Sequence, residues 1–225
     1  MIPWELLDNA PIPGSREELH LFRRDSEFSI RVDREELMNS RMHGSEEALA
    51  RIACSRIAER QSAHVLIGGL GMGFTLRAAL RELGKDATVK LVELSPAVVA
   101  WNREPLADLA GRPLEDPRVQ VVEADVAEQI RATRSKYDAI VLDVDNGPEG
   151  FTRRGNDWLY GKGGLAAARN ALRARGILAV WSAAPAPRFT ERMRAAGFKV
   201  EDFCVPARGD RGGPNHTVWI GESAQ

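Results

Sequence analysis

Apolar and polar residues alternate in two short runs near the beginning of the chain. Residues 19–24 and 27–32 each alternate in this way and flank a polar turn, which predicts a β-hairpin. Residues 35–38 extend the pattern with a third short strand. Behind Ser45, a suitable N-cap, apolar positions recur at helical spacing. Residues 1–60 are therefore expected to form a small β-rich region, built on a β-hairpin, with a lead-in helix.

From His64 onward, short apolar runs alternate with amphipathic segments. The apolar runs predict strands at residues 64–68, 88–94, 118–123, 137–143, 176–182, 199–204 and 216–221. The amphipathic segments predict helices at residues 74–83, 96–109, 164–174 and 187–196. The last two strands are joined by a Gly- and Pro-rich segment without a helix signal, which indicates an antiparallel edge hairpin. Residues 61–225 are thus expected to form an α/β, Rossmann-like domain with a doubly wound, mostly parallel seven-stranded sheet.

The charge of the chain is almost balanced, with 31 Lys and Arg against 32 Asp and Glu. Such a surface creates no bulk field that favours nucleic acid or an anionic membrane. Residues 1–8 lack the features of a signal peptide, and no apolar run reaches the length of a membrane span. We therefore expect a cytoplasmic protein without a nucleic-acid or membrane partner. Cys54 and Cys204 stand outside any CxxC motif and predict no metal site.

Three glycines follow the strand at residues 64–68. Gly69, Gly71 and Gly73 lie two residues apart, so the backbone can turn sharply and leave amides open to a ligand. A dinucleotide turn would need glycine or alanine at position 74, which is Phe74, and no Walker-type lysine follows. The remaining G-x-G-x-G pattern resembles the S-adenosylmethionine turn of class I methyltransferases. These glycines are therefore candidate cofactor-binding residues.

Acidic residues stand at the ends of the next two strands. Glu93 follows Gly73 by 20 residues and is placed to accept hydrogen bonds from two ribose hydroxyls. Asp125 follows the third strand, where it either binds the adenine amino group or caps a helix at residues 126–131. Together with the glycines, these acids predict a site for an adenosine derivative.

The fourth strand ends in three polar residues, Asp143, Asp145 and Asn146, at the edge of the sheet where ligands bind in such folds. Polar side chains at the end of an apolar strand are difficult to explain by packing. We expect Asp143 and Asp145 to be catalytic and Asn146 to bind the substrate.

A long polar segment at residues 147–164 is typical of a lid loop. Its aromatic residues Trp158 and Tyr160 either line a substrate pocket or pack the loop onto the sheet. We include both among the candidate substrate-binding residues.

These motifs together resemble the spermidine synthase family, aminopropyltransferases with the class I methyltransferase fold. The resemblance is carried by the hairpin, the glycine turn with residues 75–77 behind it, Glu93 and Asp143. It implies that Asp143 deprotonates or orients an attacking amine. It also implies that Glu46, which matches an acid at the start of the lead-in helix, binds the substrate.

The chain also departs from the family. The family's glycine turn carries an aspartate that meets the amino group of decarboxylated S-adenosylmethionine, whereas residues 68–73 here contain no acid. A tyrosine that precedes the helix acid in the family is also absent. Backbone amides without an acidic side chain beside them can bind the carboxylate of intact S-adenosylmethionine. We therefore expect methyl transfer from that cofactor.

The acceptor is expected to be a small molecule, with an amine as the candidate suggested by Asp143. Aminopropyl transfer from decarboxylated S-adenosylmethionine to a polyamine is the alternative. A nucleoside-binding module without catalysis is a third interpretation. The oligomeric state stays open, a homodimer included.

Overall fold

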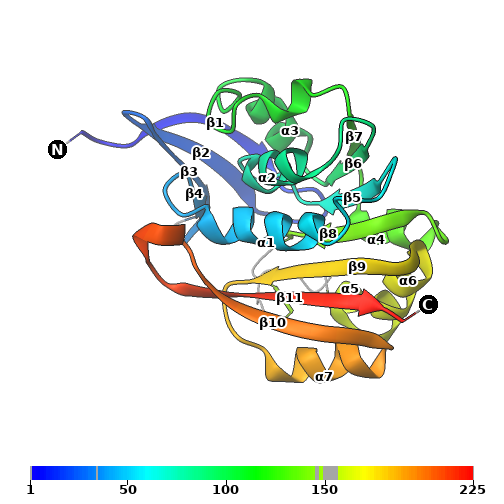
Figure 1. The fold of residues 1–225 in the computed structure, drawn as a ribbon. Coiled ribbons are helices and arrows are strands. Elements are labelled where there is room, and N and C mark those ends of the chain that lie inside the picture. The colour runs from blue at the N-terminus through cyan, green and yellow to red at the C-terminus, as the bar shows by residue number, and fades with distance from the viewer. Residues whose placement is uncertain (1, 34, 145–146, 149–156, 225) are drawn as a thin grey trace.

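Two β-sheets form the framework of the protein in this computed structural model, which describes residues 2–33, 35–144, 147–148 and 157–224 (Figure 1). The first sheet is antiparallel and comprises β1 (Glu5–Pro11), β2 (Glu18–Arg24), β3 (Glu27–Val32) and β4 (Glu35–Asn39), in that order. The predicted hairpin is β2 and β3, which pair from Leu19 with Val32 to Arg24 with Glu27. β1 is largely exposed and does not alternate apolar with polar residues, so the sequence pattern does not predict it.

The second sheet has seven strands in the order β10-β11-β9-β8-β5-β6-β7. These are β5 (His64–Gly68), β6 (Thr88–Glu93), β7 (Val119–Glu123), β8 (Tyr137–Leu142), β9 (Leu172–Ser182), β10 (Phe198–Pro206) and β11 (Asn215–Ser223). Neighbouring strands from β9 to β7 are parallel, whereas β10 and β11 form an antiparallel edge. This arrangement confirms the predicted α/β fold with its doubly wound, mostly parallel sheet.

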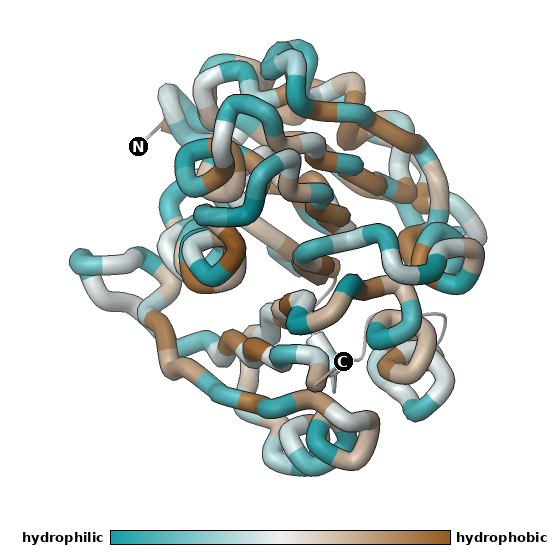
Figure 2. The backbone as a smooth tube through the Cα atoms, turned by 45° about the vertical axis from the view of Figure 1, so that its right-hand side comes forward, coloured by the Kyte–Doolittle hydropathy of each residue, from teal (hydrophilic) through white to brown (hydrophobic). Residues whose placement is uncertain are grey.

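Helices cover both faces of the second sheet (Figure 1). One face packs against α1 (Gly44–Ser55), α2 (Phe74–Glu82) and α3 (Pro96–Arg103). The other packs against α4 (Val126–Arg131), α5 (Asp157–Tyr160), α6 (Lys162–Ala171) and α7 (Pro187–Ala195). Short 3₁₀ helices lie at Pro113–Glu115 and Gly209–Arg211. Burial of apolar strand residues between two helical layers supplies the main driving force for this fold, and Figure 2 shows hydrophobic stretches along the strands between the helices.

The amino-terminal sheet is joined to the second sheet's helices by specific contacts. Asp8 of β1 accepts a hydrogen bond of 2.7 Å from Nε1 of Trp101 in α3, and Trp101 is buried. The lead-in helix α1 packs against α2, β8, β9 and β11. The division of the chain at residue 60 stays a prediction.

Some helix boundaries differ from the sequence pattern by more than one residue. α3 ends at Arg103, before the expected residue 109, because Pro105 disfavours helical geometry in the residue that precedes it. α6 ends at Ala171, because Leu172 already pairs with Tyr137 of β8. The expected lid loop contains α5 and the start of α6, so its carboxy-terminal part is helical.

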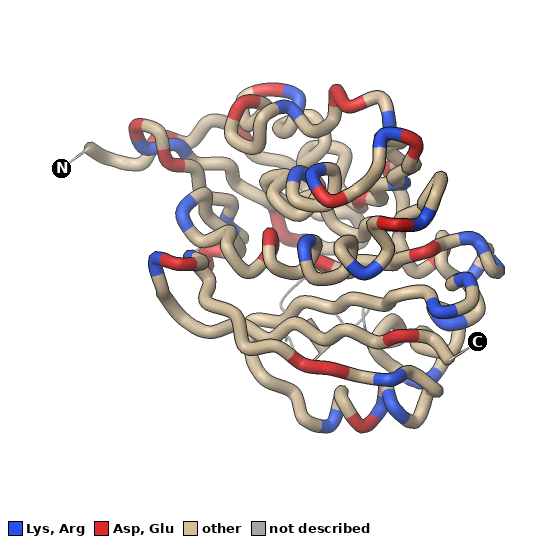
Figure 3. Tube along the Cα trace, in the orientation of Figure 1, with Lys and Arg blue, Asp and Glu red and all other residues tan. Residues whose placement is uncertain are grey.

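No helix in the described part of the chain is long and apolar enough to cross a membrane. Acidic and basic residues are interspersed over the trace in Figure 3, in line with the balanced charge.

Candidate active site

The register of the parallel strands places one residue from each strand end in a row along the carboxyl edge of the sheet. Gly68 of β5 pairs with Leu142 of β8 and with Val92 of β6. Leu142 in turn pairs with Val180 of β9, and β7 continues the register on the other side. One step further along the strands, the row comprises Trp181, Asp143, Gly69, Glu93 and Glu123. Since side chains alternate along a strand, the row continues the face that packs against α1, α2 and α3.

The glycine turn brings its backbone into contact with the end of β8. Gly69 has φ +89° and Gly73, the N-cap of α2, has φ +84°. A Cβ at Gly69 would lie 2.1 Å from the carbonyl oxygen of Asp143, so only glycine fits there. Asn102 of α3 supports the turn by donating a 2.8 Å hydrogen bond to the carbonyl of Gly71. The backbone of the turn therefore approaches the end of β8 closely.

Glu93, at the end of β6, is held on both sides by backbone amides. Its Oε2 accepts a hydrogen bond of 2.8 Å from Leu70 N in the glycine turn, and its Oε1 accepts one of 2.8 Å from Ser95 N. Each carboxylate oxygen can accept more than one hydrogen bond. These two contacts fix the orientation of the carboxylate, and ribose binding by Glu93 stays a prediction.

The side chain of Asp143 contacts the start of α2, just after the glycine turn. Its Oδ2 accepts a hydrogen bond from Oγ1 of Thr75, a buried residue in the first turn of α2. Burial raises the pKa of the Asp143 carboxyl to about 6, the Thr75 hydrogen bond opposes this shift, and the charge of Glu93 adds to it. A carboxyl with this pKa can both accept and release a proton near neutral pH.

Glu46, in the first turn of α1, is the second acid beside Asp143. Its backbone oxygen lies 3.5 Å from the Thr75 hydroxyl that also contacts Asp143. Burial raises the pKa of Glu46 well above its ordinary value, and the charges of Asp143 and Glu47 raise it further. Two such neighbouring carboxyls cannot both ionise easily. A bound cation would lower both pKa values and favour the charged forms of the two groups.

Glu47 is directed to a different cluster. It forms an ion pair with Arg77 of α2, and its Oε1 lies 3.4 Å from Nδ1 of His43. The His43 ring stacks on Phe74 with 4.1 Å between ring centroids, and burial lowers the pKa of His43. This cluster connects α1 to α2.

The model of the spermine/spermidine synthase domain family matches residues 42–190. The chain belongs to this family. The match begins just before α1 and includes the glycine turn, Glu93, Asp143 and the end of β9, so it covers the whole row of strand-end residues described above.

Curated proteins described as polyamine aminopropyltransferases are similar to part of the chain. Polyamine aminopropyltransferase 1 of Streptomyces coelicolor is 45% identical over 82 residues, which cover 36% of this chain and 15% of the relative. The polyamine aminopropyltransferase of Mycobacterium tuberculosis (strain H37Rv) is 31% identical over 159 residues, which cover 66% of this chain and 29% of the relative. The matched segment thus spans less than a third of the length of either relative.

Solved structures of spermidine synthases share the fold. The enzyme from Thermotoga maritima has a TM-score of 0.75 and 17% identity, covering 98% of this chain and 73% of that one. A spermidine synthase in complex with the transition-state analogue AdoDATO has a TM-score of 0.73 and 17% identity, covering 98% of this chain and 72% of that one. The spermidine synthase fold therefore extends over nearly the whole chain.

The family assignment shows that the expectation of methyl transfer is wrong. The family model and the named relatives are those of polyamine aminopropyltransferases, not methyltransferases. The expectation depended on the missing acid in the glycine turn. That argument considered one loop only, whereas the fold also brings the start of α1 to Thr75, the partner of Asp143, and the charge of Asp143 raises the pKa of Glu46.

Asp125 caps a helix, which is the alternative role that the sequence predicts for it. Its Oδ1 accepts a hydrogen bond of 2.7 Å from Ala127 N and so caps α4. The residue is exposed. A contact with an adenine amino group stays a prediction.

The aromatic candidates for substrate binding pack on the face of the second sheet that α4 and α6 cover. Trp158 packs under Arg131, whose guanidinium carbon lies 3.6 Å from the centroid of the indole ring. Tyr160 is buried and donates a hydrogen bond of 3.0 Å to the carbonyl of Val144. Both belong to the α4 and α6 face of the sheet, and their role stays a prediction. Asp145 and Asn146 lie outside the described residues.

Sequence reasoning did not single out Thr75 or Trp181. Thr75 entered the sequence analysis only as part of residues 75–77 behind the glycine turn. Trp181 entered it only as part of the predicted strand at residues 176–182. The signal for Trp181 is its register: a strand parallel to β8 that ends at the same level places its last inward residue beside Asp143.

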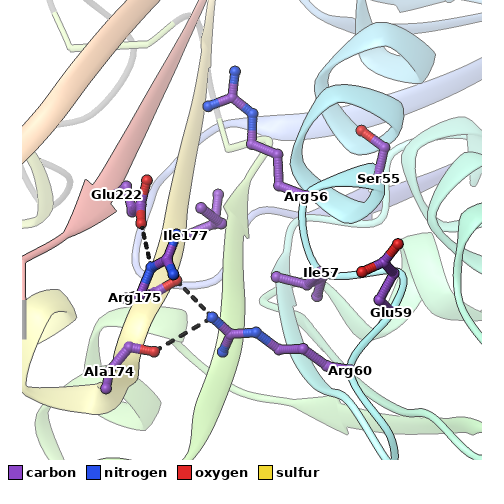
Figure 4. A pocket seen from close by; sticks show the side chains of 9 residues that line it. All are labelled: Ser55, Arg56, Ile57, Glu59, Arg60, Ala174, Arg175, Ile177 and Glu222. Atoms are coloured by element: carbon purple, nitrogen blue, oxygen red, sulfur yellow. Dashed lines mark hydrogen bonds and ion pairs between the residues drawn. The ribbon is translucent and has the colours of Figure 1, made fainter.

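A polar hollow of about 630 Å³ lies at the opposite edge of the sheet, between the end of α1 and the start of β9 (Figure 4). Arg60 donates hydrogen bonds to the carbonyls of Ala174 and Arg175, and also pairs with Asp138. Arg175 pairs with Glu222. Arg60 thus joins the segment after α1 to β8 and β9, and Arg175 joins β9 to β11, so the hollow has a structural explanation separate from the active site.

Proposed function

We propose that this chain transfers the aminopropyl group of decarboxylated S-adenosylmethionine to an aliphatic amine of the polyamine class. The observation that carries the proposal is Asp143 at the end of β8, which contacts Gly69 through its backbone and Thr75 of α2 through its carboxylate, with the backbone of Glu46 close to the same Thr75 hydroxyl. The family membership of the chain supports the same reaction. The donor supplies an electrophilic carbon next to a sulfonium, and the acids suit a cationic acceptor.

In the proposed reaction, the acceptor nitrogen attacks the aminopropyl carbon that is bonded to the sulfonium sulfur. The new C–N bond forms as the C–S bond breaks, and the bonding electrons leave with sulfur to give neutral methylthioadenosine. Asp143 takes the proton that the nitrogen loses. Because alkylamines have pKa values of about 10, they are mostly protonated at neutral pH, and a carboxylate at the reacting nitrogen makes the attack feasible.

Glu93 and the glycine turn have the positioning role in this proposal. Glu93 would bind the ribose hydroxyls, and its two amide contacts keep its carboxylate in one orientation. The turn would let the sulfonium region approach the end of β8. Holding the two reactants in line supplies much of the rate enhancement in a displacement reaction of this kind.

Calorimetry with decarboxylated S-adenosylmethionine, intact S-adenosylmethionine and methylthioadenosine tests the donor. The decarboxylated form is expected to bind at least about tenfold more tightly than the intact form, because the carboxylate of the intact form would approach Asp143 and Glu46. Glu93→Ala is the control, since it is expected to weaken binding of all three ligands by about 1 to 3 kcal/mol. Tighter binding of intact S-adenosylmethionine would contradict the proposal.

The rate should depend on the protonation of Asp143. Since the Asp143 pKa is raised to about 6, the carboxylate that accepts the proton is lost as the pH falls through this value, and kcat/KM is expected to decrease below about pH 6 and level off above it. Thr75→Val removes the hydrogen bond that lowers this pKa and should move the inflection to higher pH. Steady-state kinetics between pH 5 and 8 would measure this. A profile that is flat in both proteins would refute the assignment of Asp143 as the base.

A further inference from the structure

We infer that Asn102 of α3 is a positioning residue for the donor, because it holds the glycine turn in the conformation that binds the nucleoside. The inference deepens the proposed function and depends on it for the identity of the ligand. Asn102 lies outside the motifs that carry the family resemblance. Its side chain acts on the ligand through the turn.

The glycine turn needs support from outside. Gly69, Gly71 and Gly73 have φ values of +89°, +53° and +84°. Glycine adopts such values without strain, but it loses more conformational entropy than any other residue when its backbone is fixed. A turn with a glycine at every second position therefore has many alternative conformations, and contacts from neighbouring elements have to select one of them.

In the part of the chain that the structure describes, two side chains from other elements hold the backbone of this turn by hydrogen bonds. Oε2 of Glu93 accepts a hydrogen bond of 2.8 Å from Leu70 N, and Nδ2 of Asn102 donates one of 2.8 Å to the carbonyl of Gly71. Glu93 is also proposed to bind the ribose, so its carboxylate serves the turn and the ligand together. Asn102 serves the turn.

The Asn102 side chain is itself held in place by its own helix. Nδ2 also donates a hydrogen bond of 2.9 Å to the carbonyl of Val98, one turn earlier in α3. Both partners of Nδ2 are carbonyl oxygens, which only accept, so the orientation of the amide is settled. Its Oδ1 lies beside Gly73, where a Cβ would come within 3.1 Å of it. The buried amide thus contacts the turn at Gly71 and at Gly73 from a fixed position.

Glu93 and Asn102 belong to one connected unit, the end of β6 and the helix α3. Ser95, the N-cap of α3, donates a backbone hydrogen bond of 2.8 Å to Oε1 of Glu93. This unit therefore holds two successive residues of the turn, Leu70 and Gly71, from two points. Loss of the Asn102 amide leaves Glu93 as the remaining side-chain contact with the turn.

A turn released in this way binds the donor more weakly, because apparent affinity falls with the fraction of protein in the binding conformation. A turn that spends about a tenth of its time in that conformation loses about tenfold in affinity. Bound donor selects the same conformation again, so the rate at saturating donor should not change. A positioning role therefore alters the KM for the donor and leaves kcat unaltered.

Calorimetry with methylthioadenosine and steady-state kinetics test the inference in Asn102→Leu, which removes the amide and keeps a side chain of similar size. The variant is expected to bind methylthioadenosine about tenfold more weakly. The KM for decarboxylated S-adenosylmethionine should rise by the same factor, with kcat within about twofold of wild type. Hydrogen exchange of residues 68–74 should be faster in the free variant, since the turn opens more often.

Trp101→Phe is the matched control. Trp101 is the preceding residue of α3, is also buried, and donates a hydrogen bond of 2.7 Å to Asp8 of β1. The control thus removes one hydrogen bond of the same helix to a different neighbour, and its methylthioadenosine affinity should stay within about twofold of wild type. Asn102→Ala is the second test variant. Alanine favours helical structure, so α3 is kept, and the same loss of affinity is expected.

The outcomes separate this inference from the proposed reaction. Methylthioadenosine affinity that is unchanged in both Asn102 variants would overturn the inference. Equal losses in Asn102→Leu and Trp101→Phe would also overturn it, because α3 would then act by general packing. So would a lower kcat at an unchanged KM for the donor. A protein that shows the expected pattern of methylthioadenosine binding and exchange but transfers no aminopropyl group would contradict the proposed reaction and leave the inference standing.

Discussion

Replacing Asp143 by asparagine is expected to lower kcat with an amine acceptor by at least about a hundredfold. Asparagine keeps the size of the side chain and an oxygen that can accept the Thr75 hydrogen bond, but it cannot take a proton. General base catalysis of this kind contributes about 10²- to 10⁴-fold in rate. Because Asp143 is proposed to act on the acceptor nitrogen, methylthioadenosine affinity should change by less than about twofold. Single-turnover kinetics and calorimetry would measure the two quantities.

Asp145→Asn is the matched control for this variant. The residue is a second aspartate two positions further along the chain, so it tests whether the rate depends on one carboxylate or on a generally acidic segment. A much smaller loss in the Asp145 variant would support a single base. Full turnover of Asp143→Asn on the true acceptor would show that positioning alone accounts for the rate.

Replacing Gly69 by alanine is expected to destabilise the protein by about 2 to 5 kcal/mol. Its φ of +89° is strained for a residue with a Cβ, at roughly 1 to 2 kcal/mol. The new atom would also lie 2.1 Å from the carbonyl oxygen of Asp143, which forces the ends of β5 and β8 apart, and overpacking of this kind costs about 1 to 3 kcal/mol. Denaturant unfolding would give the free-energy difference.

Gly111→Ala separates the two causes. Gly111 has a similar φ of +72°, but a Cβ there would meet no atom within 4 Å. Its replacement is expected to cost only the backbone strain, about 1 to 2 kcal/mol. Equal losses in the two variants would mean that the contact between Gly69 and Asp143 does not constrain the site.

The fold could be predicted because its strands are apolar runs separated by clear turn signals. Period-2 alternation identified β2 and β3, and the apolar runs identified the strands of the second sheet. The boundaries that differ depend on tertiary contacts. Leu172 continues a helical pattern in sequence, yet it joins β9 because β8 offers Tyr137 as a partner.

Only those candidate site residues that stand at the end of a strand could be predicted from the sequence. Gly69, Glu93 and Asp143 were found because strand ends of a parallel sheet meet at one edge. The contact between Asp143 and Thr75, and the approach of Glu46 to both, join segments about 30 to 100 residues apart and leave no local signal. For the same reason, the expectation of methyl transfer was wrong: it considered the glycine turn alone and had no information on contacts from other elements.

Product analysis by mass spectrometry tests the central claim most directly. The full chain would be incubated with 1,4-diaminobutane and either decarboxylated or intact S-adenosylmethionine. We expect an amine extended by one aminopropyl group, together with an equal amount of methylthioadenosine, from the decarboxylated donor only. A methylated amine with S-adenosylhomocysteine from the intact donor, or no product from either, would contradict the proposed aminopropyl transfer.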